Sequence, residues 1–133
     1  MFTTTRKVKE TLVIGHNVFI TVEGVYRKEV EIKMIAPKEI KVSPFQKKDY
    51  LPERIGKVFP VFTHSMYRQI MEIRYLVLLL NKEILINNVC MLSPQNYRPN
   101  SIIFAVDAPK KLEVNRLMIY RKKFPNRPSM IPR

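Results

Sequence analysis

The chain has 133 residues, is 46% hydrophobic, and carries 24 Lys and Arg against 11 Asp and Glu, which gives a formal net charge of +13. This apolar content argues against a disordered chain, and no apolar run is long enough for a membrane-spanning helix. The single cysteine, Cys90, excludes an internal disulfide and fits a reducing compartment, so a cytoplasmic location is expected. The first ten residues lack the apolar stretch of a signal peptide.

The positive charge is spread unevenly along the chain. Residues 74–133 hold 11 Lys and Arg against 3 Asp and Glu, a net charge of +8. Such a surface attracts polyanions, of which nucleic acid is the obvious one. The alternative is a solubilising surface that contacts nothing specific.

The first 42 residues have the pattern of short antiparallel strands. Val18, Ile20 and Val22 alternate with more polar positions, as in a half-buried strand. Turn residues separate this run from its neighbours. The pattern predicts five strands, at about 2–8, 11–14, 17–24, 29–35 and 38–42.

A helical connector is predicted between residues 45 and 73. The run "SPFQ" (43–46) has Ser43 as a helix cap and Pro44 at the first helical position, with Pro52 ending the helix after about two turns. The helical spacing of Met66, Ile70 and Ile73 predicts a second helix over 64–75.

The β pattern then restarts and matches the first part of the chain. Shifting the first part by 72 residues places Val30 on Ile102 and "APKEIKV" (36–42) on "APKKLEV" (108–114). The match indicates an internal duplication. Pro94 and Pro99 interrupt the second version, so its hairpin is expected to be shortened or bulged. We therefore divide the chain into a first copy (1–44), a connector (45–73), a diverged second copy (74–123) and a basic tail (124–133).

A five-stranded unit of this size buries too little surface to be stable alone. Two units in one chain suggest that each completes the core of the other. The expected fold is mainly β with short helices: two five-stranded copies interleaved as a single-chain pseudo-dimer with a barrel-like or sandwich-like core.

The runs "TRKVKETLVIG" (5–15), "VEGV" (22–25) and "APKEIKV" (36–42) resemble the CsrA/RsmA family of bacterial post-transcriptional regulators. The resemblance covers residues 1–42 without gaps. It returns more weakly over about 74–123, where "DAPKKLEVNRLMIYRKK" (107–123) is the best match.

The resemblance implies an interleaved dimer that binds RNA hairpins with a GGA-containing loop and regulates translation. In the family, the outer strands of one subunit, its first and fifth, complete the sheet of the other. Each RNA site joins the first strand of one subunit to the fifth strand of the other. Each of these strands contributes an arginine.

The two copies depart from this family pattern in complementary ways. The first copy keeps the first-strand arginine, Arg6, but has Pro44 at the fifth-strand position. The second copy has Leu78 at the first-strand position and keeps the fifth-strand arginine, Arg116. With crossed strands, one composite site holds both arginines and the other holds neither. The resemblance therefore implies one working RNA site per chain.

The RNA-binding residues that the resemblance implies come from both copies: Thr5, Arg6, Lys7, Ala108, Pro109, Lys110, Val114, Asn115 and Arg116. Additional phosphate contacts are expected from Lys111, Arg121, Lys122 and Lys123.

Other functional classes find less support. His16 and His64 have no ligand partners at metal spacing, and no catalytic set appears, so neither a metal, a cofactor nor an enzyme is expected. Two alternatives stay open: a diverged paralogue that acts through protein–protein interaction without specific RNA binding, and non-specific DNA binding through charge. The sequence also leaves open whether two chains associate further.

Overall fold

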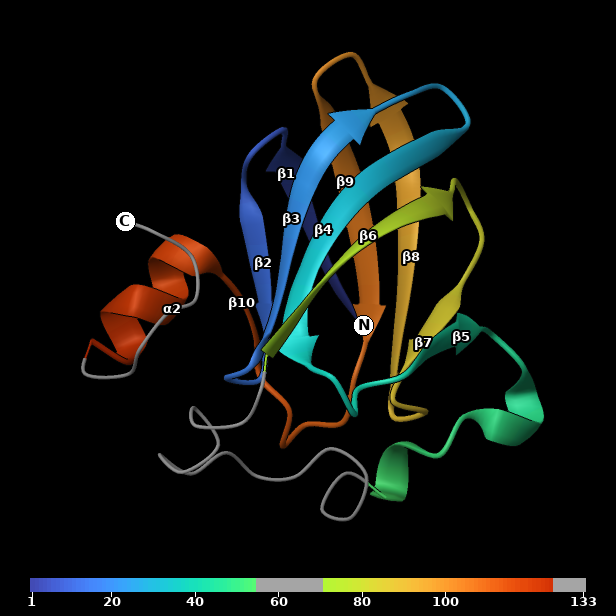
Figure 1. Ribbon diagram of the computed structural model, residues 1–133, viewed down its shortest axis with the longest axis vertical. Helices are drawn as coiled ribbons and strands as arrows, with labels where there is room; N and C mark the ends of the chain where they lie inside the picture. The colour runs from blue at the N-terminus through green and yellow to red at the C-terminus, as the bar shows by residue number, and fades with distance from the viewer. Residues whose placement is uncertain (55–70, 126–133) are drawn as a thin grey trace.

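The computed structural model describes residues 1–54 and 71–125, and within these ranges it consists mainly of strands (Figure 1). The first five strands are β1 (Phe2–Lys7), β2 (Thr11–Ile14), β3 (Val18–Val25), β4 (Glu29–Pro37) and β5 (Val42–Pro44). Two 3-10 turns follow, η1 (Lys47–Asp49) and η2 (Pro52–Arg54). The remaining elements are β6 (Met71–Leu79), β7 (Ile84–Ile86), β8 (Cys90–Arg98), β9 (Ser101–Asp107), β10 (Val114–Arg116) and the helix α2 (Leu117–Lys123).

Two five-stranded antiparallel sheets face each other as a sandwich (Figure 1). One sheet has the order β1-β9-β8-β7-β5, and the other has the order β10-β2-β3-β4-β6. Each sheet therefore takes its three central strands from one copy and its two edge strands from the other. This confirms the expected interleaved arrangement, because neither copy completes a sheet alone.

Backbone hydrogen bonds repeat between the two copies at a spacing of 72 residues. The Val8 N–H donates to Asn100 O at 3.2 Å, and the Leu80 N–H donates to Lys28 O at 3.0 Å. The same repetition holds for Gly15 N–H to Glu113 O and Asn87 N–H to Lys41 O, both at 2.7 Å, and for Ile40 N–H to Pro37 O at 3.0 Å and Leu112 N–H to Pro109 O at 2.9 Å. The two copies thus share turn geometry as well as strand order, which is what a duplicated unit would show.

The second copy departs from this symmetry at Pro94, where the sequence predicted a distorted hairpin. The Val22 N–H donates to Glu10 O at 3.1 Å, but Pro94, its counterpart, has no N–H to donate. The pairing of β8 with β9 shifts register between Gln95 and Arg98, and the pairing of β3 with β4 shifts at the equivalent place, between Val22 and Gly24. The predicted bulge is therefore present in the second copy, but the first copy, which has no proline there, has one too.

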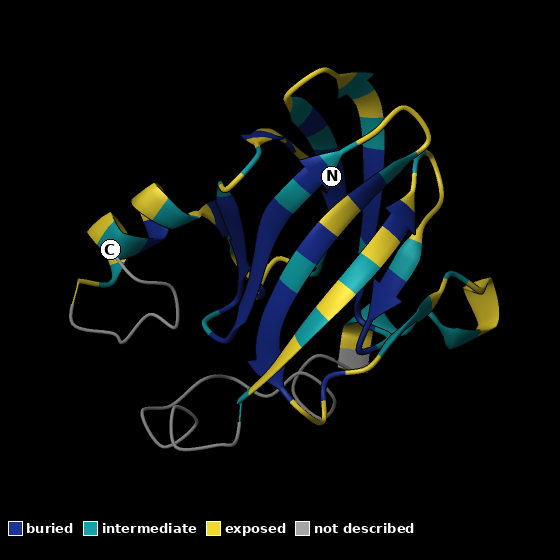
Figure 2. Cartoon of the chain, turned by 45° about the horizontal axis from the view of Figure 1, so that its top comes forward, coloured by how far each residue is buried: buried dark blue, intermediate teal, exposed yellow. Residues whose placement is uncertain are grey.

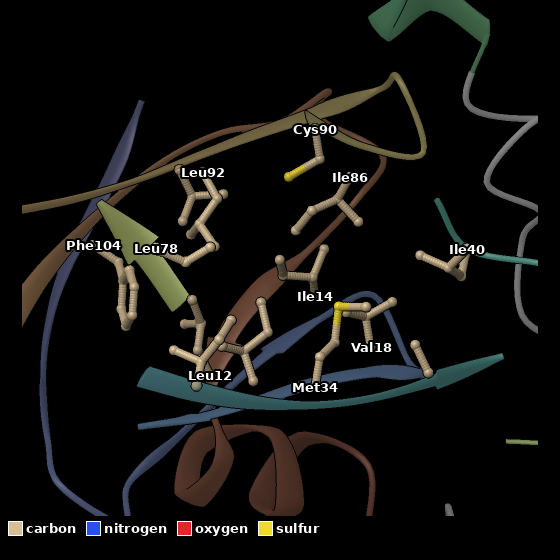
Figure 3. Packing of buried hydrophobic residues seen from close by; sticks show 14 of the residues in the cluster. Leu12, Ile14, Val18, Met34, Ile40, Leu78, Ile86, Cys90, Leu92 and Phe104 are labelled. Atoms are coloured by element: carbon tan, nitrogen blue, oxygen red, sulfur yellow. The ribbon is translucent and has the colours of Figure 1, made fainter. Parts of the chain in front are cut away.

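The main core lies between the sheets and uses equivalent positions of the two copies. Most inward side chains of the central strands are buried (Figure 2), and those of one sheet contact those of the other (Figure 3). Full burial of one such side chain stabilises the fold by roughly 1.5 to 3 kcal/mol. The members that Figure 3 labels are Leu12, Ile14, Val18, Met34, Ile40, Leu78, Ile86, Cys90, Leu92 and Phe104.

A second, smaller cluster lies on the outer face of the sheet that contains β2. There the buried Tyr120 of α2 packs with Val13, Phe19 and Ile35. The helix begins directly after β10, so this packing fixes the chain that leaves the sheet edge at Arg116.

The helix predicted after Ser43 is not formed. Ser43 and Pro44 lie in β5 and pair with β7, and only the 3-10 turns η1 and η2 follow. Pairing with a strand far along the chain outweighs the local capping pattern. The fifth strand accordingly begins at Val42 rather than at residue 38.

The helix predicted over 64–75 is wrong for residues 71–75, and residues 64–70 lie outside the described ranges. β6 begins at Met71 and pairs with β4 without interruption, from Pro37↔Met71 to Glu29↔Leu79. Backbone hydrogen bonds to β4 make this segment a strand, although its apolar residues have helical spacing. No helix among the described residues has the length and apolar character that crossing a membrane requires.

Candidate nucleic-acid interface

The edge strands β1 and β10 meet where the two sheets come together at one corner of the sandwich. β1 is an edge of one sheet, and β10 is an edge of the other. The Arg116 Nε donates a hydrogen bond to the Thr4 Oγ1 at 3.1 Å, although the two residues are 112 positions apart. Thr4 is buried, which fixes the acceptor. The structure thus joins the first strand of one copy to the last strand of the other.

Arg6 is held firmly at this corner. Its side chain is largely buried, its Nε donates to Thr5 O at 2.8 Å, and its Nη2 lies 3.9 Å from the Glu10 Oε1. Burial lowers the Arg6 pKa, Glu10 acts in the opposite direction, and the positive charge of Arg116 lowers the pKa further. Arg6 therefore adds a fixed positive charge to this corner but presents little exposed surface to a ligand.

Arg116 adds a second positive charge to the corner. It is exposed, unlike Arg6, and lies near enough for the two positive charges to act on each other. Two guanidinium groups held together repel, and a bound anion would relieve that repulsion. The corner is therefore suited to an anionic ligand.

Two adjoining depressions run along this corner and share Phe2 and Val114. One, of about 250 Å³, is bordered by Asn115, Arg116 and residues of β1. The other, of about 220 Å³, is bordered by Ala108, Pro109 and Lys110. Most of the predicted binding residues therefore lie along one continuous surface.

Asn115 is placed differently from the exposed residues around it. It is buried opposite Val13 in the pairing of β10 with β2, on the sheet face that α2 covers. Its Nδ2 has no hydrogen-bond partner among the described residues, and the residue borders the depression of about 250 Å³. A buried amide N–H without an acceptor is costly, so a ligand acceptor reaching this depth would stabilise it.

The remaining predicted residues surround the corner with positive charge. Thr5 and Lys7 are exposed on β1, and Lys110, Lys111 and Lys122 are exposed near β10 and α2. Two other cations are less available: Arg121 is half-buried, and the Lys123 Nζ lies 3.4 Å from the Glu113 Oε1.

The opposite corner, where β5 and β6 meet, lacks both arginines. Arg6 pairs with Ile102, and Leu78 pairs with Val30, the residue 72 positions before Ile102. This register confirms that Leu78 occupies the position of Arg6. Likewise, Arg116 pairs with Leu12, and Pro44 pairs with Ile84, again 72 positions away.

An apolar groove takes the place of the arginine pair at this second corner. It has a volume of about 600 Å³, and among the described residues that line it Lys82 is the one cation, next to Glu83. Leu78 itself is buried in the main core, and its aliphatic side chain has no hydrogen-bond donor for a ligand. The groove is lined mainly by the apolar residues Pro44, Phe45, Val77, Leu78, Leu79 and Ile84.

The model of CsrA, a global regulator protein family, matches residues 1–43 of the chain. Residues 1–43 are a CsrA-family segment. They include β1, with Arg6, and the central strands of one sheet, whereas Arg116 comes from outside the CsrA match. The interleaved sheets nevertheless bring Arg116 against the CsrA segment at Thr4. No solved structure gives a significant match to this chain.

Some features of the site carry no clear sequence signal. Thr4 holds Arg116, and Phe2 and Ile119 border the depressions, yet none of the three belongs to a motif that marks it. Side chains alternate along a strand, so the sequence places Thr4 on the same face as Arg6. It could not indicate that Thr4 contacts Arg116, which lies 112 residues away.

No group of metal-ligating side chains occurs within residues 1–54 and 71–125. The ring of His16 contacts aromatic residues instead: its Nδ1 lies 3.1 Å from the Tyr120 Oη, and its ring lies edge-on to Phe124 at 4.6 Å. His64 lies outside the described residues. His16 therefore belongs to the packing of α2.

Proposed function

We propose that this chain is an RNA-binding post-transcriptional regulator that recognises GGA-containing hairpin loops through one composite site, formed by β1 and β10. The observation that carries the proposal is the asymmetry of the two corners. One corner holds Arg6 and Arg116 together, and the equivalent positions of the other hold Leu78 and Pro44. As a regulator of the CsrA type, the protein is expected to act by binding and not by catalysis.

The arginine corner has the chemistry that single-stranded RNA requires. The exposed guanidinium of Arg116 can donate two hydrogen bonds to guanine O6 and N7 or stack on a base. The Thr4 hydroxyl holds this group in place beside the buried Arg6. In the part of the chain that the structure describes, no strand pairs with the outer edges of β1 and β10, and these edges offer backbone groups to unstacked bases.

The surrounding lysines suit the phosphate backbone. Lys7, Lys110 and Lys111 are exposed around the corner and extend the positive surface beyond the two arginines. Contacts of this kind carry no sequence information, so each loss should weaken the binding of all RNAs alike and reduce its salt dependence.

The direct test compares Arg116→Ala with Pro44→Ala in a gel shift with a GGA hairpin. These residues occupy equivalent strand positions, so Pro44→Ala is a matched control. Arg116→Ala should weaken binding by about 1 to 3 kcal/mol, or about 5- to 150-fold, because a base-contacting guanidinium is lost. Pro44→Ala should leave the affinity unchanged.

The stoichiometry of binding provides a second readout. Titration of the chain with the hairpin should saturate at one RNA per chain, because only one corner has arginines at the two positions of Arg6 and Arg116. Two equal sites per chain would contradict the proposal. Equal affinity for duplex DNA of the same length would indicate non-specific binding through charge.

The apolar groove between β5 and β6 favours one other function, which is protein–protein interaction without specific RNA binding. This alternative predicts no complex with the GGA hairpin even at low salt, where non-specific contacts are strongest.

A further inference from the structure

β6 differs from the other three strands that form sheet edges. β5 and β10 have only three residues each, and β5 contains Pro44. β1 presents Thr3, Thr5 and Lys7 on its exposed face. Short strands, proline and charged side chains are the devices that keep a sheet edge from pairing with another chain. β6 has nine residues in continuous register with β4, and in the described structure no strand pairs with its other edge.

The outward face of β6 is apolar along its whole length. The side chains of Ile73, Tyr75, Val77 and Leu79 are 57%, 73%, 56% and 53% exposed. In Figure 2, the alternation of exposed and less exposed residues along β6 appears as yellow and teal bands beside β4. In β1, which has the same place in the fold, polar residues occupy three of these four positions. The fold itself therefore does not require apolar residues there, and an exposed row of this kind indicates an interaction surface.

The charges next to this face do not suit a polyanion. β4 and β6 together carry Glu29, Glu31 and Glu72 against Lys33 and Arg74, a net charge of −1 in a chain of +13. This edge should therefore attract RNA less than the arginine corner does, and a second copy of the basic chain is repelled less here than elsewhere.

The outward face of the strand is also complementary to itself. In an antiparallel pair related by a two-fold axis, the sequence of one strand faces its own reverse. An axis through Tyr75 pairs all nine residues of β6, and every outward residue then meets an apolar partner. The outward pairs are Tyr75 with Tyr75, Ile73 with Val77, and Met71 with Leu79.

We propose that two chains associate through β6, edge to edge and antiparallel about Tyr75. The two sheets that contain β6 then join into one continuous sheet of ten strands, because each contributes five. The apolar groove beside β6, which Pro44 and Phe45 line, adds contact area at the ends of the paired strands. Pairing of two single strands is a small interface, so the dimer should dissociate in the micromolar range.

This association leaves the arginine corner open, because β10 and β6 are opposite edges of the same sheet. If the proposed RNA site is correct, the dimer presents two such sites and regains the two-site valency of a symmetric dimer. The association itself does not depend on RNA, so each proposal can fail without the other.

Sedimentation of the full chain tests the association in the absence of RNA. The wild type should shift from monomer to dimer as its concentration rises through the micromolar range. Val77→Lys should weaken the dimer by about tenfold or more, because it places a charge opposite an apolar residue at the paired edge. Met118→Lys is the matched control, since Met118 is 69% exposed on α2 and should leave the dimer intact.

A cross-link tests the position of the axis. Two residues directly opposite in an antiparallel pair have Cα atoms about 4.5 to 5.5 Å apart, which fits a disulfide. Tyr75→Cys should therefore form a disulfide-linked dimer on mild oxidation, whereas Met118→Cys should not. Cys90 will not compete, because it is buried and burial raises its pKa to about 12.

Two results would overturn the proposal. One is a wild type that stays monomeric at about 200 μM, well above the expected dissociation constant; the exposed strand would then belong to an unlike protein partner. The other is a dimer that resists Val77→Lys and gives no cross-link through Tyr75→Cys, which would place the contact elsewhere. Equal unfolding temperatures for the variants and the wild type would show that the changes act at the surface.

Discussion

At the scale of single residues, the arginine corner depends on side chains that no ligand needs to touch. Thr4 accepts a hydrogen bond from Arg116, and Glu10 lies beside Arg6. These contacts fix the direction of two long side chains before a ligand arrives. Binding of RNA at this corner, as we propose, should then cost less conformational entropy than binding by free surface arginines.

Cys90 is a residue whose environment gives a clear pH dependence. Burial, the larger effect, and the nearby Asp107 raise the pKa of its thiol from 9.0 to about 12. The folded state therefore keeps the proton over a pH range in which the unfolded state loses it. This contribution to stability is complete below about pH 9 and is lost as the pH rises toward 12.

We predict that the free energy of unfolding falls by up to about 1.4 kcal/mol per pH unit because of Cys90 in this range. Urea unfolding at several pH values should show a smaller slope for Cys90→Ala than for the wild type. Lysine titration affects both proteins alike, so the difference between the slopes isolates the thiol. Equal slopes would contradict the prediction.

Sequence reasoning located the two arginines but not their surroundings. The motif and the 72-residue shift identified Arg6, Arg116, Leu78 and Pro44, since register follows from alternation in strands. The same reasoning could not show that Arg6 is largely buried or that Asn115 lies beneath a helix. Those facts depend on how β10 and α2 pack, which local sequence does not encode.

At the scale of elements, α2 is held mainly by one large buried side chain, beside which the partly buried Leu117 also packs. Tyr120 is fully buried, its ring meets Phe19 edge-on at 6.2 Å, and its hydroxyl lies 3.1 Å from the His16 Nδ1. A seven-residue helix is unstable by itself, so this packing determines whether it forms.

We predict that Tyr120→Ala lowers the free energy of unfolding by about 3 to 5 kcal/mol, because a large buried aromatic side chain is removed. Urea unfolding followed by circular dichroism would measure the change. Met118→Ala, on an exposed position of the same helix, should change stability by less than about 0.5 kcal/mol. Similar losses for the two variants would mean that α2 contributes little to the fold.

The strands were easier to predict than the helices for a physical reason. A strand such as β3 repeats its apolar residues every second position, and two sheets that cover each other enforce that pattern. The connector had only weak capping and spacing signals. Pairing of Ser43 with Leu85 and of Ile73 with Ile35 overrode them, and those pairs are distant in sequence.

At the scale of the whole molecule, the two copies share both sheets and the core between them. Phe104 of β9 and Ile20 of β3 lie in opposite sheets and belong to one buried cluster. Neither sheet can unfold without withdrawing edge strands from the other. The chain should therefore behave as a single cooperative unit.

We predict one unfolding transition for the wild type, with the same midpoint by circular dichroism and by tyrosine fluorescence. Phe104→Ala and Ile20→Ala should each lower the stability of this transition, by about 3 to 5 and about 2 to 5 kcal/mol. Neither should produce a second transition. Separate unfolding of the two sheets in either variant would show that the copies are independent domains.

The interleaved strands have a consequence for how this chain can evolve. In a symmetric homodimer, every mutation appears twice, so a change that harms one binding site harms both. In this chain, different positions of one sequence form the two corners, so each corner can mutate independently of the other. Leu78 and Pro44 could replace arginine positions at one corner while Arg6 and Arg116 were kept at the other. The fold therefore permits the residues of one corner to change while those of the other stay the same.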